Sequence, residues 1–202
     1  MRERDFADLA AGAALAAPAE TFRLADGAAL TVRAIRPTDG PRLVGYLQRL
    51  SVESRRNRLF GAVSEPSQAL LERMLQLDGS DGAMLLVFAG AATQGAVVAE
   101  AMQLRAQGTA RWEIALSVAD AWQGRGLGTW LLRALECRAR LAGVRYLFGD
   151  VLRTNATMKH LARREGFSVR SPFTDALLIE VVKDLSLTRA PAPCGETYAF
   201  AA

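Results

Sequence analysis

The sequence predicts an α/β fold in a single domain, and two observations carry that prediction. Segments with the period-2 alternation of strands are interleaved with segments that show the apolar face of a helix. Near the middle of the chain, residues 112–142 form a strand, a glycine-rich loop and a helix in direct succession. This order is typical of a mixed sheet with helices packed against it.

Composition is consistent with that fold and narrows the classes of function. The chain has 202 residues, half of them hydrophobic, and a formal net charge of +4. Such a length suits one domain with a sizeable core. The apolar runs are shorter than the ~18 residues that cross a bilayer. The basic residues form no dense block, so neither a membrane nor a nucleic acid is expected as a partner.

The predicted elements follow one another with recognisable boundaries. Asp26-Gly27 is a hairpin turn signal, and Thr38 or Asp39 can cap the first helix. We predict strands at 30–36, 84–88, 95–104, 112–118, 144–151, near 168 and at 176–182, and helices at 39–50, 67–77, 127–142 and 156–165. The order is β-α-α-β-β-β-α-β-α-β-β.

Domain boundaries are expected near the two ends of the chain. Residues 1–20 are alanine-rich and are interpreted as a flexible N-terminal arm, because Asp5 and Asp8 argue against a targeting peptide. Residues 21–186 form the folded domain, and residues 187–202 are interpreted as a flexible C-terminal tail.

The two cysteines, Cys137 and Cys194, lack the spacing of metal ligands, and no metal site is expected. Cys137 falls in the helix after the glycine-rich loop and is interpreted as a small packing residue. A reducing, cytoplasmic setting fits these cysteines best.

The glycine-rich loop predicts a site for an anion. It contains Gly124, Gly126 and Gly128 and lies at the N-terminus of the helix that follows. There, unpaired backbone N–H groups and the positive end of the helix dipole favour phosphate. Glycines remove the Cβ atoms that would keep a ligand away from those amides. The loop is therefore predicted to be a phosphate cradle.

The spacing of the glycines argues against two common phosphate loops, although an enzyme that binds a dinucleotide or S-adenosylmethionine stays open as a third alternative. A Walker loop requires a lysine, which is missing here. A dinucleotide fingerprint requires a third glycine where Thr129 or Leu131 stands. Asp150, about 20 residues further on, is the one feature that favours a dinucleotide, because dinucleotide-binding loops are followed at that distance by an acid that binds the ribose. A polar residue at a strand end is the preferred interpretation of Asp150.

The remaining pattern is Gln/Arg-x-x-Gly-x-Gly/Ala, filled by Gln123, Gly126 and Gly128. Three further features accompany it: Glu113, Asn155 and Gly166-Phe167. Together they resemble the GCN5-related N-acetyltransferase (GNAT) superfamily. The resemblance implies the GNAT fold, which has a mixed central sheet flanked by helices and strands splayed at the cofactor site. It also implies acetyl-CoA as co-substrate.

The resemblance also implies which residues hold acetyl-CoA. The backbones of Leu116 and Val118 would hydrogen-bond the pantetheine arm, and the glycine-rich loop would hold the pyrophosphate. Asn155, a good helix cap in its own right, would also contact the arm. The implied cofactor-binding residues are Leu116, Ser117, Val118, Gln123, Gly124, Arg125, Gly126, Leu127, Gly128, Thr129 and Asn155.

Glu113 is the candidate catalytic residue. An alkylamine has a pKa of about 10.4, so it arrives protonated and requires a base. Glu113 shares a strand face with the small residues Ala115 and Ser117. The pattern alone supports two interpretations of Glu113 equally. One is a catalytic base, and the other is an ordinary exposed carboxylate or an ion-pair partner of Arg111. The resemblance favours the base, because the position matches the base of bacterial protein lysine acetyltransferases.

The acceptor is expected to be a primary amine, and the resemblance favours a protein lysine. Many superfamily members have a tyrosine where Ala162 stands, and alanine is usual in the protein-acetylating branch. Residues 32–39 and 50–60 are similar to the same branch. Acetylation of a small-molecule amine and non-catalytic binding of acyl-CoA stay open. For the arginines of residues 50–60, a solvated basic loop is at least as well supported as a site; they are Arg55, Arg56 and Arg58.

Overall fold

The computed structural model describes residues 19–24, 26–61, 66–77, 81–106, 109–171 and 176–187. Its strands are β1 (Glu20–Arg23), β2 (Ala29–Ala34), β3 (Gly82–Ala89), β4 (Val97–Arg105), β5 (Arg111–Val118), β6 (Tyr146–Leu152), β7 (Ser168–Arg170) and β8 (Leu178–Asp184). Its α-helices are α1 (Gly40–Arg49), α2 (Val52–Leu59), α3 (Gln68–Leu75), α4 (Leu127–Leu141) and α5 (Ala156–Arg164). Two 3-10 turns, η1 (Pro37–Asp39) and η2 (Asp120–Trp122), complete the described elements.

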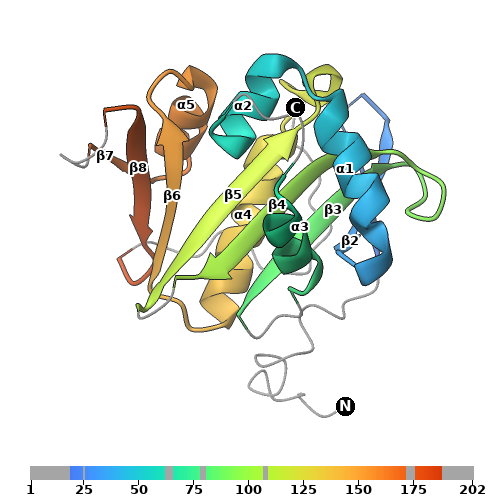
Figure 1. The fold of residues 1–202 in the computed structure, drawn as a ribbon. Helices are drawn as coiled ribbons and strands as arrows, with labels where there is room; N and C mark the ends of the chain where they lie inside the picture. The colour runs from blue at the N-terminus through green and yellow to red at the C-terminus, as the bar shows by residue number, and fades with distance from the viewer. Residues whose placement is uncertain are drawn as a thin grey trace, which may run out of the picture.

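The strands form one mixed sheet in the order β1-β2-β3-β4-β5-β6-β8-β7 (Figure 1). Neighbouring strands pair antiparallel, with the exception of β5 and β6, which are parallel. That parallel pairing extends only from Arg111 to Glu113 on β5. The sheet is thus continuous, but its two halves are joined at this point by a short ladder.

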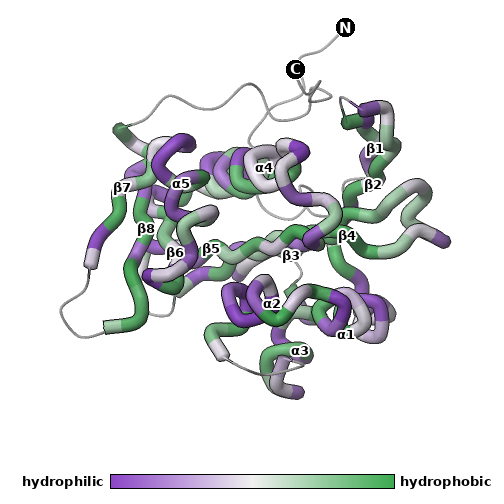
Figure 2. The backbone as a smooth tube through the Cα atoms, turned by 90° about the horizontal axis from the view of Figure 1, so that it is seen from above, coloured by the Kyte–Doolittle hydropathy of each residue, from purple (hydrophilic) through white to green (hydrophobic). Residues whose placement is uncertain are grey.

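Helices cover both faces of the sheet. Helices α1, α2 and α3 lie on one face, and α4 and α5 lie on the other (Figure 2). The first face buries Leu43, Leu47 and Met74 against the sheet. The second buries Leu131 and Leu135 of α4. Helix α4 shows the apolar spacing from which it was predicted.

The predicted fold class is confirmed, and two local predictions are corrected. Helix α2 was not predicted, because residues 52–59 show no apolar stripe. Asp39 does not cap α1 through its side chain. Its carboxylate instead binds the guanidinium of Arg33 over 2.6 and 2.7 Å and accepts the N–H of Arg36 over 2.8 Å. The hairpin turn is as predicted, with Gly27 at φ +85°.

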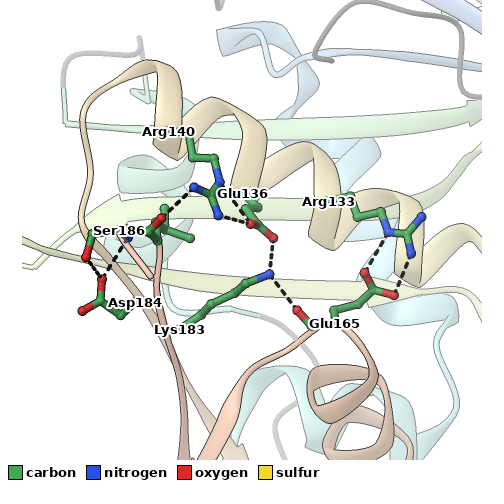
Figure 3. A network of polar contacts seen from close by, with 8 residues as sticks. Arg133, Glu136, Arg140, Glu165, Lys183, Asp184 and Ser186 are labelled. Atoms are coloured by element: carbon green, nitrogen blue, oxygen red, sulfur yellow. Dashed lines mark hydrogen bonds and ion pairs between the residues drawn. The ribbon is translucent and has the colours of Figure 1, made fainter. Parts of the chain in front are cut away.

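A buried ion network joins α4, α5 and β8 (Figure 3). The ammonium of Lys183 donates to the carboxylate of Glu136 over 2.6 Å and to the backbone carbonyl of Glu165 over 2.7 Å. The guanidinium of Arg140 donates to the other oxygen of Glu136 over 2.8 and 3.1 Å. Because a buried carboxylate is costly unless it is paired, these contacts fix the packing of α4 on the sheet.

Cys137 lies in the buried face of α4, as expected for a packing residue, but it is disulfide-bonded. The sequence analysis did not expect this bond, and Cys194, the other cysteine, lies outside the described residues. Within the described part of the chain, no helix has the length and apolarity needed to cross a membrane.

Candidate active site

The site lies where β5 and β6 separate. Their pairing ends at Glu113 and Phe148, so residues 114–118 have β4 on one side and no strand on the other. A cavity of about 420 Å³ occupies this opening. It is lined by β5, β6 and α5, by the glycine-rich loop, and by α2 on the opposite face of the sheet. The opening therefore connects the two faces of the sheet, as expected for splayed strands.

Gly149 fixes the point at which the strands diverge. A Cβ atom at this position would lie 2.7 Å from the backbone carbonyl oxygen of Ile114. That distance is shorter than a real contact, so only glycine allows β6 to approach β5 this closely. Gly149 and Ile114 both line the cavity. The narrow end of the opening is thus set by backbone contact.

The glycine-rich loop has the conformation of an anion cradle. Gly124 and Gly126 have φ values of +72° and +83°, a region that side chains rarely adopt. Helix α4 begins at Leu127, and its first N–H groups have no partner within the helix. A Cβ on Gly128 would lie 3.3 Å from the side chain of Leu161. The loop therefore has the features of an anion site, which needs amides that side chains do not cover.

The predicted cofactor-binding residues divide into two groups. Those that line the cavity are Leu116, Ser117, Val118, Gln123, Gly124, Gly128 and Asn155. The others belong to the same loop and helix start but do not line the cavity. Arg125 forms an ion pair with Asp26 and stacks on Trp122, while Leu127 is buried in the core. Gly126 and Thr129 complete the second group.

Asn155 caps α5, as its sequence position suggested. Its side-chain oxygen accepts the backbone N–H of Met158 over 2.9 Å. Asn155, Met158 and Leu161 all line the cavity, so the first turns of α5 form one of its walls. Ala162, where many superfamily members have a tyrosine, is fully buried.

Glu113 lies at the last position of the β5–β6 pairing and is half-buried. It is not among the residues that line the cavity, but Ala115 and Ser117, on the same strand face, are. Burial raises the pKa of Glu113 above its usual value, and the carboxylate of Asp150 raises it further. Arg58 and Arg73 act in the opposite direction without cancelling the shift in this pKa.

A buried polar network lies under the cavity. The guanidinium of Arg58 donates to both oxygens of Glu100, over 2.5 and 3.1 Å. The hydroxyl of Ser117 donates to Glu100 over 2.6 Å, and it shares a hydrogen bond of 2.9 Å with the hydroxyl of Tyr46. Arg58 and Ser117 line the cavity, whereas Glu100 has no exposed surface. This network joins α1, α2, β4 and β5.

Comparison with known proteins identifies the family. The model of the acetyltransferase (GNAT) family matches residues 41–167, which is more than half of the chain. The chain belongs to this family.

Two curated relatives are acetyltransferases. Acetyltransferase Pat of Mycolicibacterium smegmatis is 33% identical over 136 residues, which cover 67% of this chain and 40% of that protein. Acetyltransferase PA5475 of Pseudomonas aeruginosa is 30% identical over 153 residues, which cover 71% of this chain and 77% of that protein. The chain thus spans less than half of the length of Pat.

Solved structures agree with the family. The GNAT domain of S. lividans PAT superposes with a TM-score of 0.73 at 26% identity, covering 82% of this chain and 96% of that domain. At 20% identity, yncA of Salmonella typhimurium, solved with its cofactor acetyl-CoA, shares the fold, with a TM-score of 0.63, covering 82% of this chain and 99% of that protein.

The family membership favours an acetyl-CoA site over a dinucleotide site and leaves the identity of the acceptor amine open. The matched region is an acetyltransferase (GNAT) domain, and the two curated relatives are named acetyltransferases. A dinucleotide site is set aside, although Asp150, the residue that favoured it, does line the cavity from β6.

The sequence analysis left the segment that forms α2 open between a solvated basic loop and a part of the site, and it did not predict the helix. This helix contributes Glu53, Ser54, Asn57 and Arg58 to the cavity. Solvated basic residues were one interpretation of this segment, and Arg58 is instead buried and paired. The available signal was the capping pattern: Ser51 accepts the N–H of Ser54, with an acid in the first turn and arginines in the last.

Proposed function

We propose that the chain transfers the acetyl group of acetyl-CoA to the side-chain amine of a protein lysine, with Glu113 as general base. The observation that carries the base assignment is the place of Glu113, half-buried where β5 and β6 part and beside Ala115 and Ser117. A carboxylate with a raised pKa is a better proton acceptor than an ordinary one. Glu113 takes the proton of the lysine ammonium, and the neutral amine then attacks the thioester carbonyl directly. The new C–N bond forms, the C–S bond breaks, and CoA leaves as the thiolate, which takes a proton from water.

We assign the cofactor to the opening between the splayed strands. The pyrophosphate would bind the backbone N–H groups from Gln123 to Thr129 at the start of α4. The pantetheine arm would hydrogen-bond the free edge of β5 at Leu116 and Val118. The carbonyl of Val118 already accepts the side chain of Gln123 over 3.0 Å, so the arm would use its second lone pair or the backbone of Leu116. Asn155 would contact the arm from α5.

A protein lysine fits the acceptor side better than a polycationic small molecule. The lining of the cavity that we assign to the acceptor side includes Arg58 and Glu53, together with Asn57 and the partly exposed Phe60. Mixed charge and an apolar rim suit one lysine side chain on a protein surface. Glu53 and Asp150 are the observations that favour a small amine instead, since both are acids that line the cavity.

The test is acetylation of the host proteome. Wild-type protein and Glu113→Gln are incubated with acetyl-CoA and cell extract, and new acetyl-lysines are mapped by mass spectrometry beside a panel of small amines. Glu113→Gln keeps the shape of the side chain but cannot accept a proton. Turnover near neutral pH should therefore fall by ~10²–10⁴, while affinity for CoA persists. The loss should shrink at high pH, where the amine is already neutral.

Each alternative has a distinct result. Normal turnover by Glu113→Gln at pH 7 would remove Glu113 as the base. Rapid acetylation of one small amine, without Glu113-dependent acetylation of proteins, would reject the lysine acceptor and leave the acetyltransferase assignment intact.

We also assign the reaction to the cytoplasm, where acetyl-CoA would be available to the enzyme. The disulfide of Cys137 is the observation that weighs against this location, because disulfides are rare in a reducing cytosol. Cell fractionation decides the point: recovery of the protein in an extracytoplasmic fraction would reject the assignment.

A further inference from the structure

Helix α2 forms the acceptor-side wall of the cavity, yet little apolar burial holds it there. Of its eight residues only Arg58 is buried, and Val52 is 72% exposed. A helix this short is unstable by itself in water. The position of α2 therefore depends on polar contacts near its ends, and the pair of Arg58 with Glu100 supplies one of them.

The contact at the other end is made by Asp120, in the turn directly before the glycine-rich loop. One oxygen of its carboxylate accepts the backbone N–H of Ser51 over 2.9 Å. The other accepts the hydroxyls of Ser51 and Ser54, each over 2.7 Å. Although burial acts to raise the pKa of Asp120, these hydrogen bonds outweigh it and lower that pKa. A charged carboxylate at the start of a helix is also stabilised by the helix dipole.

Gln123 extends this contact into the loop. Its side-chain amide donates to the hydroxyl of Ser54 over 3.1 Å and to the carbonyl of Val118 over 3.0 Å. Gln123 thus contacts α2 and the end of β5 through its side chain, while its backbone begins the loop assigned to the pyrophosphate. A change in this loop on cofactor binding would therefore reach Ser54, and through it Asp120, by these hydrogen bonds.

We propose that Asp120 is a positioning residue that couples the cofactor loop to α2, so that binding of CoA fixes the wall against which the acceptor docks. This coupling rests on the proposed function, because it requires CoA on the loop. Glu53 and Asn57 of α2 line the cavity on the acceptor side. A wall that is fixed only in the loaded enzyme favours an acceptor that binds after acetyl-CoA.

The coupling can be measured by hydrogen–deuterium exchange on the whole protein, with CoA as the probe. In the wild type, CoA should slow exchange in the loop, residues 119–129, and in α2. In Asp120→Ala, the loop should still be protected by CoA, whereas α2 should exchange roughly tenfold faster and no longer respond to CoA. Ser54→Ala removes hydrogen bonds to Asp120 and Gln123 and should act in the same direction. This second variant keeps the test decisive if Asp120→Ala does not fold.

Two further variants separate positioning from a general loss of structure. Asp184 accepts the N–H and hydroxyl of Ser186 over 2.9 and 2.6 Å, the same kind of contact at a position that does not line the cavity. Asp184→Ala should leave exchange in α2 unchanged. Asp120→Asn keeps an acceptor oxygen and should restore part of the response of α2 to CoA.

The failures are distinguishable. Protection of the loop without protection of α2 in the wild type would reject the coupling and leave the cofactor assignment in place. Equal protection of α2 in the wild type and in Asp120→Ala would do the same. Protection of neither segment by CoA would reject the assignment of the cofactor to the loop, and the coupling with it.

Discussion

The Glu136–Lys183 pair and the Arg58–Glu100 pair are chemically alike but differ in their surroundings. Both are almost completely buried. In the first pair, Arg140 also donates to Glu136, and Lys183 also donates to the backbone carbonyl of Glu165 at the end of α5. Neither Glu136 nor Lys183 lines the cavity. The second places Arg58 on the wall of the cavity, where its charge lowers the pKa of Glu113.

This difference separates two uses of a buried charge. An ion pair whose residues do not contact the site affects only the stability of the fold, because removing one partner leaves the other charged in a poorly solvated place. An ion pair that also touches the site affects the protonation of the base. Variants of both pairs should therefore lose stability, and only variants of the second pair should change the pH dependence of the reaction.

The largest effect is expected for Glu100→Gln. Arg58 would keep its buried charge without a counter-ion, which should cost about 3–5 kcal/mol and lower the melting temperature by on the order of 10 °C. The charge of Arg58, no longer balanced by Glu100, should also lower the pKa of Glu113. The charges of Asp150 and Arg73 already act on that pKa. The acid limb of kcat/KM should therefore move to lower pH. Thermal denaturation and a pH–rate profile measure the two effects.

The pH profile is the decisive part of that prediction. Glu113 has a raised pKa in the wild type, so its acid limb should lie above the ordinary value of 4.5. A variant that loses stability but keeps the wild-type limb would show that Glu100 acts on the fold alone.

A smaller and purely structural effect is expected for Lys183→Met. Glu136 would lose the ammonium at 2.6 Å but keep both hydrogen bonds from Arg140. The loss of stability should be about 3 kcal/mol, at the lower end for a broken buried pair. Below the melting transition, kcat and KM should match the wild type. A shifted pH profile in Lys183→Met would contradict the division between the two networks.

The two networks also mark the limit of what the sequence predicts. The position and backbone conformation of the glycine-rich loop could be predicted, because its requirements are local: left-handed glycines such as Gly124 and Gly126 directly before an amphipathic helix. Its role in binding the cofactor stays a prediction. The strands and helices with a clear apolar period were predicted for the same reason. Ala162 could also be interpreted from its local sequence, by comparison with the tyrosine that many superfamily members have at this position.

The acceptor side could not be predicted in this way, because its contacts are distant in sequence. Arg58 is buried only because Glu100, 42 residues away, is buried beside it. Asp120 is 69 residues from Ser51, whose position it holds. Nothing in the composition of residues 52–59 distinguishes a solvated loop from a helix held at both ends. The capping pattern at Ser51 was a signal for the helix that the sequence analysis did not use, and it carries no information on the partners of the helix.

The smallest effect, and the finest test of the comparison, is expected for Ser117→Ala. Burial raises the pKa of the Tyr46 hydroxyl, and the charge of Glu100 raises it further, so Tyr46 stays protonated. Because the hydroxyl of Ser117 donates to Glu100, the shared bond takes its proton from Tyr46. Ser117→Ala should therefore leave a buried donor unpaired and cost about 1–3 kcal/mol.

A double-mutant cycle with Tyr46→Phe sharpens that result. Removing both hydroxyls leaves no unpaired donor at Tyr46, so the double variant should be less destabilised than the sum of the two single variants. Affinity for CoA should be unchanged in all three variants, because the pantetheine arm is assigned to the backbone of Leu116 and Val118 and not to the hydroxyl of Ser117. Simple additivity would show that the Tyr46–Ser117 bond contributes nothing. A CoA affinity that falls with Ser117→Ala, but not with Tyr46→Phe, would instead place the hydroxyl of Ser117 in the cofactor site and extend the site network to the bound thioester.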